Sequence, residues 1–241
     1  MAAKIKKGKV LDKWRRKRYF SMLAPKIFQE RELGQTMAYE PNELQGRCIS
    51  TNLMMITGNI KRQHINMTFR VNKVQGDTAF TIVDKYEIVP AAIKRKVRRQ
   101  KDRIDSSFQC VTKDNKLIRM KPMLITSSKV SKAVRAALRK AMVQAVLSLV
   151  RANDYDTVII DMISEKLQRD IWGAINRISP VKSVDIRVMK YIGEFTGKFE
   201  IPAFAAAAKK EELKEEAEEV EESTEEEKPT PTAEEPEEVQ A

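Results

Sequence analysis

Residues 65–83 constrain the fold most strongly, because they alternate and turn as a β-hairpin does. The first strand has the two-residue period of a half-buried strand, with polar residues between its apolar members. Those apolar members are Ile65, Met67, Phe69 and Val71. Gln75-Gly76-Asp77 supplies a turn, and residues 79–83 return as the partner strand. The N-terminal half is therefore predicted to be built around a sheet.

Further strands extend this prediction. Residues 48–56 form a weaker strand candidate, and residues 106–112 and 117–126 flank a turn at 113–116 as a second hairpin. Pro122 lacks an N–H for a ladder, which places the last strand at an edge or a bulge. Five short strands with tight turns and one inserted helix predict either a small barrel or a strongly curled, β-barrel-like sheet.

The inserted helix is predicted over residues 90–104. Pro90 suits a first helical turn, and Ile93, Val97 and Ile104 recur at helical spacing as one narrow apolar stripe. The other faces are cationic, with one acid, Asp102. The seven basic residues are Lys94, Arg95, Lys96, Arg98, Arg99, Lys101 and Arg103.

A solvated surface helix is the alternative to a binding helix. Solvated helices usually mix charges, whereas Lys94–Arg98, Arg95–Arg99 and Arg99–Arg103 are like-charge pairs, each destabilising by about 0.2–0.5 kcal/mol. Only Arg98–Asp102 is attractive. The charge pattern therefore favours a polyanion lying against this helix.

The second half is predicted to be an α/β unit. A helix capped by Ser127 or Ser128 runs to about residue 152. A second helix follows Ser164 and ends before Pro180, and residues 184–188 alternate as a closing strand. The apolar face of the first helix comprises Val130, Val134, Ala137, Leu138, Ala141, Met142, Ala145 and Leu149; its opposite face carries Lys132, Arg135 and Arg139.

The two ends of the chain carry opposite charges. Residues 209–241 contain 15 Glu and four Lys, which leaves a formal net charge of +22 on residues 1–208. Such an excess predicts nucleic acid as partner, or less readily an anionic membrane surface. The low-complexity sequence from residue 205 is predicted to be disordered.

Residues 1–20 form a basic block that is predicted to stay disordered until it meets phosphate. Trp14 and Tyr19 bracket its Arg15–Arg18 cluster, and either they stack on bases or they pin the arm to the body. The predicted class is α+β. Its parts are a basic N-terminal arm (1–22), a β-barrel-like RNA-binding domain (23–126), an α/β subdomain (127–202) and a disordered acidic tail (203–241).

Several site classes lack support in this sequence. Cys48 and Cys110 have no CxxC spacing and only one histidine to join them, so they are predicted to be core residues in a reducing compartment. No secretory signal is evident, and the longest apolar run, residues 141–150, is about half of the ~20 residues of a membrane span. We expect a soluble, cytoplasmic protein without membrane contact.

Catalysis is poorly supported as well. His64 is the only histidine, and an RNA-facing or loop role suits it better than that of a general base. Asp154 and Asp156 could hold a divalent ion, but acids at a helix entry explain them more simply. We predict no enzyme, no catalytic residues, no metal and no cofactor.

The order of several short stretches resembles the archaeal–eukaryotic small-subunit ribosomal protein family called S-three-A-e, or eukaryotic-type S-one, over about residues 13–192. The carrying stretches are Lys13-Trp14, Leu23-Ala24-Pro25-Lys26-Ile27-Phe28, Leu44-Gln45-Gly46-Arg47, Gln63-His64-Ile65, Phe69-Arg70-Val71, Lys73-Val74-Gln75-Gly76, Arg103-Ile104-Asp105, Thr112-Lys113-Asp114, Arg119-Met120-Lys121-Pro122, Arg139-Lys140, Ile178-Ser179-Pro180 and Val184-Asp185-Ile186-Arg187.

The resemblance implies a structural protein of the small ribosomal subunit. Its partners would be ribosomal RNA, neighbouring ribosomal proteins and, as a further candidate, messenger RNA near the exit. The alternatives are an RNA-processing or other RNA-binding factor outside the mature ribosome, and a DNA-compacting protein. The predicted RNA-binding residues are Lys6, Lys7, Lys9, Lys13, Trp14, Arg15, Arg16, Lys17, Arg18, Lys26, Arg47, Lys61, Arg62, Lys94, Arg95, Arg98, Arg99, Lys132, Arg135 and Arg139.

Overall fold

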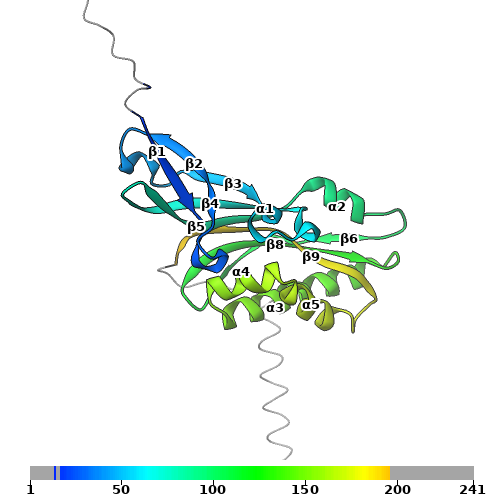
Figure 1. Cartoon of the computed structure of the whole chain (residues 1–241). Coiled ribbons are helices and arrows are strands. Elements are labelled where there is room, and N and C mark those ends of the chain that lie inside the picture. Colours follow the sequence, from blue (N-terminus) through cyan, green and yellow to red (C-terminus); the bar gives the residue numbers. More distant parts are fainter. Residues whose placement is uncertain (1–13, 15–16, 196–241) are drawn as a thin grey trace, which may run out of the picture. The chain divides into compact units, whose positions relative to one another are not determined.

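The computed structural model describes residue 14 and residues 17–195, and it confirms a mixed α and β protein (Figure 1). Nine described strands form one largely open sheet. Its main path runs in the order β2 (Glu32–Ala38), β1 (Arg18–Leu23), β5 (Thr78–Ile88), β9 (Val181–Glu194), β8 (Lys116–Thr126) and β6 (Arg103–Asp105). Closure into a barrel, one of the two predicted alternatives, is not among the strand pairs of the described residues.

Three strands lie off this path. β3 (Cys48–Asn52) pairs with β4 (Ile65–Gln75), which pairs with β5, and β7 (Phe108–Val111) pairs with β8. Both predicted hairpins are confirmed, β4–β5 and β7–β8 being antiparallel neighbours. The first turns at Gly76, whose φ of +59° favours glycine.

Helices α3 (Lys132–Ala152), α4 (Tyr155–Ile163) and α5 (Lys166–Ile175) cover one face of the sheet, as Figure 1 shows. On the other side lie α1 (Leu53–Thr57) and α2 (Pro90–Lys96). The chain also forms short 3₁₀ helices, η2 (Lys26–Phe28), η3 (Pro41–Leu44) and η4 (Ile60–Arg62). No described helix is long and apolar enough to cross a bilayer.

Buried apolar side chains lie on both the helices and the sheet, among them Leu138, Met142 and Ile171 on the helices and Met120 and Met189 on the strands. One buried cluster lies where β1 and β2 meet β4 and β5. It comprises Phe20, Met22, Ala38, Leu44, Val71 and Ala79.

The two cysteines differ in burial. Cys110 of β7 is buried, as the sequence predicts, whereas the prediction of a core position for Cys48 is wrong. Cys48 begins β3, which has β4 as its single strand partner within the described residues, so its side chain stays exposed at the rim of the sheet.

The predicted basic helix over residues 90–104 is wrong beyond its first two turns. α2 ends at Lys96, Val97 is extended, and Gln100 has a φ of +63°. Ile104 lies instead in β6, opposite Leu124, and is fully buried. Tertiary pairing therefore overrides the helical spacing, and the like-charge pairs predicted between turns of one helix do not form as such.

The helical half also differs from its prediction. α3 begins later, and its cap is Ser131, whose Oγ accepts from the Val134 N–H at 3.3 Å, rather than Ser127 or Ser128. Its buried face differs too, because Ala137 is exposed. The sequence indicates the start of α4 only through the acids at its entry and gives no range for this helix, and α5 ends before Ile178.

In the strands, residues 53–56 belong to α1 rather than to a strand, because Asn52 accepts from the Met54 N–H and caps a helix there. Pro122 lies at a register shift of the β8–β9 ladder, which confirms the bulge. The predicted strand at residues 184–188 is confirmed as part of β9, which lies inside the sheet. It pairs with β5 on one side and β8 on the other, so the sheet runs across the predicted boundary at residues 126 and 127.

Candidate nucleic-acid interface

A groove of about 560 Å³ lies between α2 and strands β5, β8 and β9. We call it the sheet groove. α2 bounds it, so it lies on the side away from α3, α4 and α5 (Figure 1). Its charged lining is almost entirely basic, with Glu87 the one acid. The basic members are Lys85, Lys94, Arg103, Arg119, Lys121, Arg187 and Lys190.

Three of these cations form a row across neighbouring strands. Lys85 of β5 pairs in register with Lys190 of β9, and Lys190 pairs with Arg119 of β8. Alternation places them here, because their neighbours Tyr86, Met189 and Met120 are buried. Like charges directly opposite in a sheet are destabilising, so the row is a candidate binding surface for an external anion.

Acids neutralise only part of the groove. Glu87 pairs with Lys85 two residues away on the same strand. Asp105 contacts both Arg103 and, at 3.9 Å, Arg187. Neither Lys190 nor Arg119 forms an ion pair with an acid of the described residues, and both side chains are exposed.

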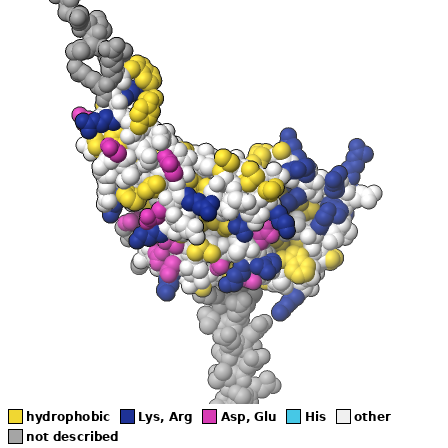
Figure 2. All heavy atoms as spheres, viewed as in Figure 1, with side chains coloured by type: hydrophobic (Ala, Val, Ile, Leu, Met, Phe, Trp, Pro, Cys, Tyr) yellow, Lys and Arg dark blue, Asp and Glu magenta, His cyan; other side chains and the backbone are white. Residues whose placement is uncertain are grey.

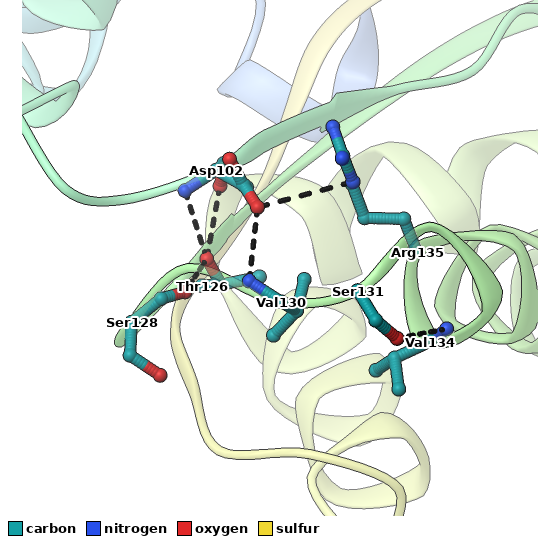
Figure 3. A network of polar contacts seen from close by, with 7 residues as sticks. All are labelled: Asp102, Thr126, Ser128, Val130, Ser131, Val134 and Arg135. Atoms are coloured by element: carbon teal, nitrogen blue, oxygen red, sulfur yellow. Dashed lines mark hydrogen bonds and ion pairs between the residues drawn. The ribbon is translucent and has the colours of Figure 1, made fainter.

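Beyond α2, the loop of residues 97–102 continues the basic surface. Asp102 ties this loop to the start of α3 (Figure 3). Its Oδ2 accepts from the Val130 N–H at 3.0 Å and lies 3.9 Å from Arg135 Nε, while its own N–H donates to Thr126 Oγ1 at 2.9 Å. Asp102, which the sequence predicts to pair with Arg98, therefore links the loop to the segment that leads into α3 instead.

Lys101 of this loop lies close to other cations, among them Lys182 of β9. Desolvation, followed by the neighbouring Lys182 ammonium, lowers the pKa of Lys101. Arg99 and Lys101 line a second hollow of about 510 Å³ with Ser127, Ser128 and Lys129. Figure 2 shows Lys and Arg side chains gathered over α2 and this loop. On the face that Figure 2 shows, a positive surface therefore covers α2 and the loop that follows it.

The structure brings together part of the predicted set. Lys94 lines the sheet groove, whereas Arg95 lines a separate hollow on the other side of α2, together with Lys61. Arg98 and Arg99 follow in the loop and are exposed. Arg62 of η4 is half-buried.

The other predicted residues lie apart from this surface. On α3, Lys132 and Arg139 are exposed, and Arg135 points to Asp102. Lys26 is exposed in η2, and Arg47 donates to Thr36 Oγ1 and to the Met37 carbonyl, so Arg47 also holds β2.

The N-terminal arm is described in part. Lys17 Nζ lies 3.7 Å from the centroid of the Trp14 ring, which is exposed, and 5.4 Å from that of Tyr39; Arg18 is exposed at the start of β1. Six predicted residues lie outside the described part of the chain, as does the acidic tail. They are Lys6, Lys7, Lys9, Lys13, Arg15 and Arg16.

Sequence reasoning missed the strand-borne cations Lys85, Arg119, Lys121, Arg187 and Lys190. A signal was present, since Arg119 and Lys121 alternate with buried Met120 and Pro122 as the outer face of a strand does. The sequence does not reveal the register between the strands, and it is this register that aligns such residues on three strands.

The residues considered for catalysis lie on separate elements, His64 between η4 and β4 and the two aspartates at the entry of α4. His64 Nδ1 lies 3.1 Å from the Lys61 carbonyl, and the ring is half-buried. Asp154 is the N-cap residue of α4 and Asp156 lies in its first turn, as the helix-entry interpretation predicts. Within residues 17–195, no three His, Cys, Asp or Glu side chains group as metal ligands.

Comparison with known proteins finds one family over most of the chain. The model of the Ribosomal S3Ae family matches residues 5–194. A protein of Methanoculleus marisnigri named small ribosomal subunit protein eS1 is 30% identical over 190 residues, which cover 79% of this chain and 96% of the relative. Relatives of the same name from Halorubrum lacusprofundi and Saccharolobus islandicus are 31% and 27% identical, over 71% and 78% of this chain and 80% and 90% of their own lengths.

Proposed function

The chain belongs to the Ribosomal S3Ae family, and on that premise we propose that it is a structural constituent of the small ribosomal subunit. Its work is to bind the RNA of that subunit and so support translation in the cytoplasm. The neighbouring proteins of the subunit are its other partners, and its role is structural rather than enzymatic.

The cross-strand row of Lys85, Lys190 and Arg119 carries the proposal for RNA binding. Lys85 has an acidic partner in Glu87, but Lys190 and Arg119 have none among the described residues, and a phosphate backbone laid across the row neutralises the repulsion between the three cations. The groove beside the row has α2 as one wall, so the same backbone also meets Lys94.

Other basic surfaces extend the contact. The arm of residues 1–22 and the exposed cations of α3 supply further phosphate contacts outside the groove. Since Lys132 and Arg139 lie on the helix layer, they meet a different stretch of RNA from the one in the sheet groove.

A triple variant tests the groove. Lys85→Gln, Arg119→Gln and Lys190→Gln together remove three phosphate contacts, so the slope of log affinity against log salt falls by about 0.7–0.9 for each. Filter binding to small-subunit RNA fragments measures the slope, and sedimentation of the tagged variant with small subunits measures assembly.

The matched control is Lys73→Gln, Lys113→Gln and Arg177→Gln, which removes the same charge from exposed sites outside the groove. The control keeps the steeper slope. Equal slopes for the two triple variants would exclude the groove as the RNA contact, and wild-type protein that never sediments with small subunits would overturn the function.

A further inference from the structure

A further hollow, of about 350 Å³ and distinct from those described above, lies where β5 and β9 diverge. β5 pairs with β9 only at residues 188–190 of β9, whereas β8 pairs with β9 from Val181 onward. The first part of β9 therefore has no strand partner on its β5 side within residues 17–195. α5 and the end of α2 complete the walls. We call this hollow the β9 pocket.

Two residues that line the pocket each have a buried oxygen atom with no donor among the described residues. Gln168 is only 9% exposed, and because its Nε2 donates to the Met162 carbonyl at 3.1 Å, its Oε1 remains an acceptor without a partner. Asp185 binds Lys96 through Oδ1 at 2.6 Å, while its buried Oδ2 also lacks a partner. Buried acceptors without donors are costly, so the pair suits a ligand that brings N–H groups.

An aromatic ring stands at the same pocket. Trp172 of α5 donates its Nε1–H to the Val181 carbonyl at 3.0 Å, which fixes the ring, yet the residue is 42% exposed. A fixed, half-exposed indole is a surface on which a planar base can stack.

Charge around the pocket is mixed, with a basic rim. Asp185 and Glu165 are its acids, and Lys96 is already paired with Asp185. The remaining cations are Arg169 and Lys182, and Lys182 stands close enough to Lys101 to lower the pKa of that ammonium. The Lys182 ammonium on the rim suits a phosphate.

We propose that the β9 pocket binds one unpaired nucleotide of an RNA strand, whose base carries an exocyclic amino group. The amino group donates to Gln168 Oε1 and Asp185 Oδ2, the base stacks on Trp172, and the phosphate meets Lys182. Adenine, cytosine and guanine offer such an amino group and uracil does not. The inference rests on the proposed RNA binding and adds a base preference to it.

The chain has two tryptophans, so a Trp14→Phe variant of the full chain makes Trp172 the only indole reporter. Hexamers of adenylate, cytidylate and uridylate are titrated against it at low salt. Adenylate and cytidylate hexamers quench Trp172 saturably, and at least about fivefold more tightly than uridylate, a discrimination at the low end of that for one good base contact.

Gln168→Met in the same background removes the acceptor at similar volume, and thermal melting checks that the variant folds. The difference between adenylate and uridylate then shrinks, while labelled small-subunit RNA still binds through the sheet groove. Should Gln168→Met fail to fold, Trp172→Leu, read by labelled hexamers, replaces it and weakens stacking on every base.

The outcomes separate the two proposals. Equal quenching by all hexamers would overturn the proposal for the β9 pocket. The same holds if no hexamer quenches Trp172 while small-subunit RNA binds with a salt slope that depends on the sheet groove. In both cases the proposed function stands. If the wild-type protein binds no RNA at all, both the pocket proposal and the proposed function are overturned. Quenching by peptides of a neighbouring protein but by no hexamer would assign the pocket to a protein partner instead.

Discussion

The Asp102 carboxylate accepts a hydrogen bond from the Val130 backbone N–H at 3.0 Å, across 28 residues of chain. This bond joins the basic loop that follows α2 to the entry of α3 (Figure 3). It explains how an acid can lie within a run of seven cations without pairing along that run.

Asp102→Ala is expected to destabilise the protein by about 1–3 kcal/mol, because it leaves the Val130 N–H without its acceptor and Arg135 without its carboxylate. Urea unfolding measures the destabilisation. Asp102→Asn, which keeps an acceptor oxygen, should destabilise less. Equal effects of the two variants would mean that the backbone bond contributes nothing.

Replacing Lys94, Arg95, Arg98 and Arg99 by Gln should lower the salt slope of RNA affinity, by about 0.7–0.9 for each phosphate that these side chains neutralise. The free protein should be no less stable, because none of the four side chains forms an ion pair within the described residues. Filter binding across a salt series gives the slope.

Lys132, Arg135 and Arg139 on α3 provide the comparison set, since they carry three of the predicted contacts on another surface. An unchanged slope for the α2 variant together with a reduced slope for Lys132→Gln and Arg139→Gln would move the main RNA contact to α3 and the N-terminal arm.

Alkaline pH should destabilise the fold through Cys110. Burial raises the pKa of the Cys110 thiol from its ordinary 9.0 to about 12. Between these values the unfolded chain loses a proton that the native protein keeps, so the free energy of unfolding falls by up to about 1.4 kcal/mol per pH unit for this group.

Cys110→Ala should therefore flatten the decline of stability between about pH 9 and pH 10.5, although it lowers stability at neutral pH by leaving a small cavity. Cys48→Ala is the control, because Cys48 is exposed. Chemical denaturation at several pH values gives both curves, and equal slopes for the two variants would contradict the assignment to Cys110.

Removal of the acidic tail after Pro202 should raise affinity for random RNA at low salt more than affinity for the cognate site. The fifteen Glu residues are expected to compete weakly for the cations of the body, because an exposed ion pair contributes under about 1 kcal/mol and is screened beyond roughly 8–10 Å. A folded RNA with dense phosphates displaces them more readily than random RNA does.

Competition binding with and without the tail tests this masking. A passive solubilising tail is the alternative, and it predicts that truncation changes neither affinity. Equal gains for random and cognate RNA would also count against masking.

The hairpin of β4 and β5 could be predicted from the sequence alone, because alternation and turn residues are local properties that Ile65, Phe69 and Gly76 already express. The same holds for the charge excess of the body, which is a sum over residues. The family could be recognised for a similar reason, since it is carried by the order of short stretches along the chain.

Only the tertiary structure determined the conformation of residues 97–104 and the position of the sheet groove. Ile104 has helical spacing to Ile93 and Val97, yet it pairs with Leu124 in β6, because burying it in the sheet outweighs one more turn of a helix crowded with like charges. The row of Lys85, Lys190 and Arg119 depends on the register between strands about 70 and 100 residues apart in the chain. Register is a long-range property that no local period expresses.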